Sequence, residues 1–160
     1  MAEDHPRAGV EYLAWNFEER PLSALPDALA ALGHERARRT LTIWEGVTMY
    51  LTESAIDDTV AAVRAFSAPG SPFAFTYFDK RAMIERPSAL IRVVGSLVGR
   101  LGEPYRFGWD PAALSAWWSA RGFAIAWDRE VDDLARELLP AHHASRVKSR
   151  GRRIALATRT

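Results

Sequence analysis

Cysteine is absent from this chain of 160 residues. Without thiols the chain can form neither a disulfide framework nor a thiolate metal site. A surplus of charge is absent too, because 21 lysines and arginines face 20 aspartates and glutamates. A balance this close to zero gives no overall attraction to nucleic acid or to an acidic membrane surface. The composition fits a reducing compartment, and we predict a cytoplasmic protein.

Long apolar runs are also missing. The longest apolar segment, residues 89–101, carries Arg92 and Arg100 and is too short to span a bilayer. Residues 1–9 form a polar leader without the apolar stretch of a secretory signal. The sequence therefore predicts no membrane partner.

A glycine-rich cofactor loop is the third absence. No G-x-G-x-x-G sequence occurs, and the nearest candidates are Gly95, Gly99 and Gly102. These glycines lie in a helix-like stretch, whereas a phosphate-binding loop of this type follows a strand. The common dinucleotide fingerprint is therefore excluded.

The residues that are present predict one α/β domain over residues 10–160. Apolar residues make up 48% of the chain and charged residues 26%, which is typical of a globular protein. The sequence patterns predict strands at 10–13, 40–45, 73–79, 123–131 and 153–159, and helices at 21–33, 53–66, 89–101, 111–121 and 132–140. This alternation predicts a sheet with helices on both faces.

Polar residues follow three of the predicted strands, as Asn16-Phe17, Glu45-Gly46 and Tyr77-Asp79. In α/β sheets of this kind ligands bind beyond the carboxyl ends of the strands. The positions predict a small-molecule site, although spacing alone favours an ordinary helix-entry carboxylate for Glu45. Asn16 fits an ordinary turn equally well, and a tyrosine such as Tyr50 is more often a core-edge residue than a ligand contact.

Two other clusters have simpler explanations. His142 and His143 are expected in a strand, where adjacent side chains point to opposite faces, and no cysteine or nearby carboxylate completes a ligand set. We therefore predict no metal site. The basic stretch 146–153 lacks interleaved aromatic residues and is expected to form a solvated hairpin rather than a nucleic-acid interface.

One segment supports a more specific hypothesis. Residues 44–60 read WEGVTMYLTESAIDDTV, which resembles the EG-x-x-x-YL segment of S-adenosylmethionine-dependent methyltransferases in the leucine carboxyl methyltransferase-like group. Its neighbours resemble that family in the same order: VEYLAWNF at 10–17, ALAALGHERARRTLTIWEG at 28–46 and SAPGSPFAFTYF at 67–78. The resemblance implies part of a class I, Rossmann-like methyltransferase fold.

The resemblance also implies roles for individual residues. Asn16 would face the adenine amino group and Phe17 would pack on the adenine ring. Glu45 would pair with the ammonium group at the methionine end of S-adenosylmethionine, and Gly46 would let the backbone approach the cofactor. Tyr50 is a substrate-side candidate. The implied reaction is O-methyl transfer to a carboxylate or hydroxyl group of a small molecule, and no catalytic residue is assigned.

The chain departs from the family at its beginning. Members of the family start with a strand and a glycine-rich turn, followed by a second strand that ends in an acid for the ribose; neither precedes Val10. The resemblance therefore implies a fold that lacks its first two strands, whose place in the sheet lies between the Asn16 strand and the Glu45 strand. We expect a truncated methyltransferase that is weak or inactive alone, or whose sheet is completed by a second chain.

Two alternatives come from other functional classes. The first is a non-catalytic interaction or oligomerisation module that uses the open sheet edge and the apolar face of residues 89–101. The second is a basic-patch nucleic-acid binder that uses Arg150, Arg152 and Arg153.

Overall fold

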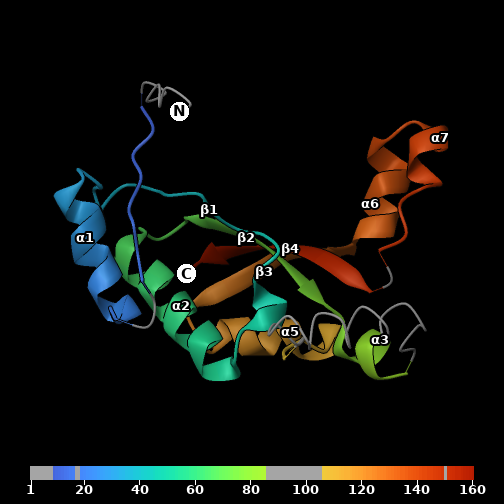
Figure 1. Cartoon of the computed structure of the whole chain (residues 1–160), viewed down its shortest axis with the longest axis horizontal. Helices are drawn as coiled ribbons and strands as arrows, with labels where there is room; N and C mark the ends of the chain where they lie inside the picture. The colour runs from blue at the N-terminus through green and yellow to red at the C-terminus, as the bar shows by residue number, and fades with distance from the viewer. Residues whose placement is uncertain (1–8, 17–18, 86–105, 150) are drawn as a thin grey trace, which may run out of the picture.

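The fold is built around one four-stranded sheet, seen in the computed structural model of Figure 1. The structure describes residues 9–16, 19–85, 106–149 and 151–160. The strands are β1 (Thr42–Trp44), β2 (Pro72–Phe78), β3 (Phe123–Glu130) and β4 (Arg152–Arg159), in the order β1-β2-β4-β3. β1 and β2 are parallel, and the other two pairings are antiparallel.

Helices lie on both sides of this sheet. They are η1 (Leu22–Ala24), α1 (Leu25–Ala31), η2 (Thr48–Tyr50), α2 (Glu53–Phe66), α3 (Lys80–Glu85), α5 (Pro111–Ser119), α6 (Val131–Leu138) and α7 (Ala141–Ala144). Figure 1 shows α2 and α5 on one side, and α6 and α7 on the other side at the end of β3. The predicted α/β class is confirmed. The helix predicted at 89–101 lies outside the described residues.

Local sequence signals set the helix bounds. The hydroxyl of Thr52 accepts a hydrogen bond from the Ala55 amide at 3.3 Å, so α2 begins at the residue after its cap. The predicted range of α2, 53–66, is confirmed. The carboxylate of Asp110 accepts from the Ala112 amide at 3.0 Å, and Pro111 fills the first helical position of α5.

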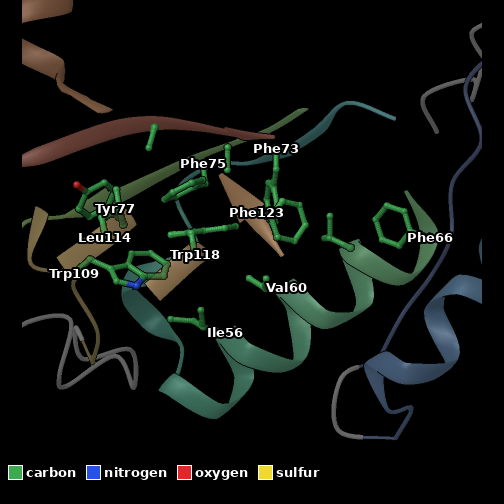
Figure 2. Packing of buried hydrophobic residues seen from close by; sticks show 13 residues of the cluster. Ile56, Val60, Phe66, Phe73, Phe75, Tyr77, Trp109, Leu114, Trp118 and Phe123 are labelled. Carbon is green, nitrogen blue, oxygen red and sulfur yellow. The ribbon is translucent and has the colours of Figure 1, made fainter. Parts of the chain in front are cut away.

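Aromatic packing between β2, α2 and α5 forms the core. Phe73, Phe75 and Tyr77 alternate along β2 and point toward these helices, as Figure 2 shows. The Trp118 ring stacks on Phe75 with 4.3 Å between the ring centroids, and Trp118 is fully buried. The neighbouring ring of Trp117 packs edge-on against Trp118. Both tryptophans therefore serve the packing of the core.

Two local predictions are wrong. Residues 10–13 form no strand: Tyr12 is 84% exposed, and the segment runs as coil beside α1 in Figure 1. A strand without a neighbour leaves its backbone donors and acceptors unpaired, so propensity alone does not create one. The histidine pair lies in the helix α7 rather than in a strand, with its ring centroids 3.9 Å apart. The described residues contain no cluster of three metal-binding side chains.

The described residues cover the second face of the sheet only in part. Strand register places Ile43 beside Ala74, Ala74 beside Leu156, and Leu156 beside Trp127. This cross-strand row, called the open row below, lies on the face that points away from α2. Ile43 is 68% exposed and Trp127 is 39% exposed. Antiparallel strands can leave one face to water, but parallel strands such as β1 and β2 are normally covered on both faces, so the exposure of Ile43 on β1 is unusual.

Candidate functional site

The carboxyl ends of β1 and β2 meet at one edge of the sheet because these two strands are parallel. Glu45 and Gly46 follow β1 directly, and Asp79 follows β2. Glu45, Gly46 and Asp79 therefore lie at the same edge of the sheet. In α/β sheets this edge is where ligands bind.

Gly46 makes the turn possible. Its φ of +72° lies in the left-handed region that side chains disfavour, and its amide donates a hydrogen bond to the Thr76 hydroxyl at 2.8 Å. A Cβ at this position would meet no atom within 4 Å. Glycine is therefore required by the backbone conformation, and the space beside it is open.

Thr76 anchors the turn from β2. Besides the bond from Gly46, its carbonyl accepts a hydrogen bond from the buried Thr48 hydroxyl at 2.8 Å. The carbonyl of Met49 accepts from the Arg106 amide at 2.7 Å, which fixes the next residues. Sequence analysis missed Thr76. The available signal was one hydroxyl within an otherwise apolar and aromatic strand.

Glu45 and Tyr50 occupy this anchored segment. Among the described residues the Glu45 carboxylate has no hydrogen-bond or ion-pair partner, and Glu45 is exposed. It is therefore accessible to a cationic group of a ligand. Tyr50 ends η2 and is half-buried.

Asn16 lies elsewhere. Its carbonyl accepts hydrogen bonds from the amides of Glu19 and Arg20, at 3.3 and 2.9 Å, in a turn before η1. Figure 1 shows the coil of residues 9–16 beside α1, away from the turn between β1 and η2. The structure does not bring Asn16 to Glu45, because no strand carries it to the sheet edge. Phe17 lies outside the described residues.

A buried polar network joins three strands and was also missed. The Tyr77 hydroxyl donates to Asp128 at 2.8 Å, and Arg153 Nε donates to the other oxygen of Asp128 at 3.0 Å. The side chains of Arg153 and Asp128 are 15% and 14% exposed. Burial, followed by the hydrogen bond to Asp128, raises the pKa of Tyr77 far above its ordinary value. The phenol is therefore a neutral donor that holds the carboxylate in place.

An apolar cavity of about 320 Å³ lies between α1, α2 and β1. Its walls come from all three elements and the turn after β1, and they include Leu25, Trp44, Val47, Leu51, Val63 and Phe73. The Thr42 hydroxyl on this wall is buried and has no hydrogen-bond partner among the described residues. A cavity of this size and character can accept apolar side chains or a small apolar ligand.

Comparison with known proteins assigns part of the chain. The leucine carboxyl methyltransferase family model matches residues 2–64. A candidate S-adenosyl-L-methionine-dependent methyltransferase of Streptomyces avermitilis is 44% identical over 61 residues, which are 38% of this chain and 21% of that protein. A similar candidate of Streptomyces coelicolor is 42% identical over 64 residues, 40% of this chain and 22% of its own length.

Residues 2–64 are therefore similar in sequence to part of the leucine carboxyl methyltransferase family and to part of these candidate S-adenosyl-L-methionine-dependent methyltransferases. The Glu45-Gly46 turn lies inside this matched region. The match spans about a fifth of the length of these curated relatives.

A solved structure shares the fold of this chain. A crystal structure of a DUF574 family protein from Streptomyces avermitilis superimposes with a TM-score of 0.58 at 12% identity. The similarity covers 88% of this chain and 53% of that chain. At this identity the similarity concerns the fold alone. Within the part of the chain that the structure describes, none of the helices is long and apolar enough to cross a membrane.

Proposed function

We propose that this chain is part of an S-adenosylmethionine-dependent methyltransferase that methylates an oxygen of a small carboxylate- or hydroxyl-bearing molecule. One observation carries the proposal. Glu45 and Gly46 lie in the matched segment, at the carboxyl edge of the parallel pair β1 and β2, and Thr76 anchors their turn.

The described residues fit one end of the cofactor. The exposed Glu45 carboxylate can accept hydrogen bonds from an ammonium group, and a charge-assisted bond of this type is stronger than a neutral one. The open space at Gly46 leaves room for a ligand near the backbone. Asn16 and Phe17 remain proposed adenine contacts that require residues 9–16 to join a completed sheet. When bound, S-adenosylmethionine supplies a methyl group activated by its sulfonium.

This chain would contribute to the reaction by aligning the methyl donor with the acceptor. A carboxylate acceptor is already a nucleophile, so no general base is needed and none is assigned. Holding donor and acceptor in line within a dry site supplies most of the rate enhancement expected for such a transfer. Tyr50, four residues after Gly46, is the proposed substrate-side residue.

We expect the chain alone to bind S-adenosylmethionine weakly or not at all, because the proposed contacts of the described residues would hold only one end of the cofactor. Isothermal titration calorimetry tests this expectation, and micromolar binding by the chain alone would contradict it. In the completed protein, Glu45→Gln should weaken binding about tenfold, the loss expected for one charge-assisted hydrogen bond. Glu53→Gln, an exposed acid at the start of α2, is the matched control and should change nothing.

A non-catalytic interaction module is the second candidate, favoured by the exposure of Ile43 on β1. Light scattering that finds a stable oligomer without cofactor affinity would support it. Nucleic-acid binding gains no support, because Arg153 of the basic stretch is paired with Asp128 and Glu130.

A further inference from the structure

β1 leaves one side without a partner strand. It is the first strand in the sheet order, and its three residues pair only with β2 among the described residues. No strand of the described ranges lies beside the backbone groups on its outer side. An open edge next to a parallel strand is a template for a further strand.

The cavity of about 320 Å³ follows the same edge on the side that faces α2. Thr42 and Trp44 are in register with Phe73 and Phe75 and share their face, so these two β1 residues line the cavity. A strand laid beside β1 would direct alternate side chains into this space. The buried Thr42 hydroxyl, which has no hydrogen-bond partner in the described part of the chain, lies at the same place.

The opposite side of β1 is also uncovered. Ile43 begins the open row and is 68% exposed, and Leu41 before it is 58% exposed. Ile43 also lines the cavity, but a small ligand there would leave Leu41 exposed and the strand edge unpaired. One occupant covers the edge, the cavity and the row together: a strand followed by a helix that crosses the open face.

We propose that this seam, formed by the β1 edge, the apolar cavity and the open row, docks the other part of a methyltransferase-type α/β domain. The DUF574 structure indicates the size of the occupant, because the similar region covers 88% of this chain but only 53% of that chain. The rest of the DUF574 chain is nearly as long as the similar region, and it is available in that protein to cover the seam. The identity of the occupant rests on the proposed function; the docking surface rests on the geometry of β1.

A second copy of this chain fits the seam less well. Pairing two β1 edges would bring together two strands of three residues each. Trp44 already packs on Phe73, at 5.9 Å between ring centroids, so a symmetric pair has no free large side chain from β1 to fill either cavity.

The absence of cysteine allows a direct test, because a single introduced thiol can be followed without background. Ile43→Cys places the thiol on the seam, and Leu138→Cys places it at an equally exposed site on α6, since Leu138 is 69% exposed. Each variant is co-expressed with the part of the candidate Streptomyces avermitilis methyltransferase that lies outside its 61 matched residues. Maleimide labelling rates are then compared with those of the chain alone.

We expect the two polypeptides to co-purify and the thiol at position 43 to react at least about tenfold more slowly in the complex, with no change at position 138. Absence of co-purification, or equal labelling at position 43 with and without the partner, overturns the proposal. Protection at position 43 in the chain alone that increases with concentration also overturns it, because a second copy would then be the occupant.

Calorimetry on the same complex separates this inference from the proposed function. Protection of position 43 together with S-adenosylmethionine binding supports both. Protection without cofactor binding supports the docking surface and contradicts the methyltransferase proposal.

Discussion

Tyr77 shows how one buried hydroxyl couples stability to pH. Burial and the hydrogen bond to Asp128 raise its folded-state pKa well above the ordinary value of 10.0. Below that value the phenol is protonated in both states, and its hydrogen bond contributes fully to stability. Above it the unfolded chain releases a proton that the folded chain retains, so stability decreases as pH rises.

Tyr77→Phe should therefore lower the free energy of unfolding by about 1–2 kcal/mol at pH 7, because Asp128 loses a buried donor. The variant should also lose less stability between pH 9 and 11, about the range in which a free tyrosine ionises. Urea denaturation over this pH range measures both effects. Tyr12→Phe, at a side chain that is 84% exposed, is the control and should follow the parent protein.

Some residues around the site could not be predicted from the sequence, because they are distant from Glu45 and Gly46 along the chain. Glu45 and Gly46 stand out because a carboxylate and a glycine end an apolar run. Thr76 is separated from them by 30 residues and becomes part of the site only through strand register. Tyr77, Asp128 and Arg153 likewise meet only when β2, β3 and β4 pair.

At the scale of elements, prediction succeeded where a signal was local. The Thr52 cap and the Asp110-Pro111 start are encoded within one turn of the helices they begin. The strand predicted at 10–13 failed, since a strand depends on a neighbour that a local pattern does not contain. Because residues 10–13 form no strand, Asn16 does not reach the sheet edge.

Thr52→Ala tests the local signal for α2. It removes the hydroxyl that accepts from the Ala55 amide and should lower the free energy of unfolding by about 1 kcal/mol. Thr52→Ser keeps the acceptor and should stay within about 0.5 kcal/mol of the parent. Thermal or urea denaturation distinguishes the two, and an equal loss for both substitutions would show that the cap hydroxyl contributes nothing.

At the scale of the whole molecule, the two faces of the sheet differ in packing. The face toward α2 and α5 carries the aromatic core, and Ile56 of α2 is fully buried against it. The opposite face carries the open row with Ile43 at its edge. The fold class was accessible from sequence because the alternation of strands and helices is a local pattern. The difference in packing between the two faces was not accessible from the sequence, because it depends on which helices and strands cover each face.

The difference between the two faces predicts stability losses of different size for the same substitution, isoleucine to alanine. Ile56→Ala removes buried methyl groups and should cost about 2–5 kcal/mol in the free energy of unfolding. Ile43→Ala removes the same groups from an exposed site and should change it by less than about 0.5 kcal/mol. Urea denaturation at two protein concentrations measures both changes. We expect the slope of the unfolding free energy against urea concentration to be the same for the parent and both variants. A loss of more than about 2 kcal/mol for Ile43→Ala that grows with protein concentration would mean that copies of the chain already cover this face in solution.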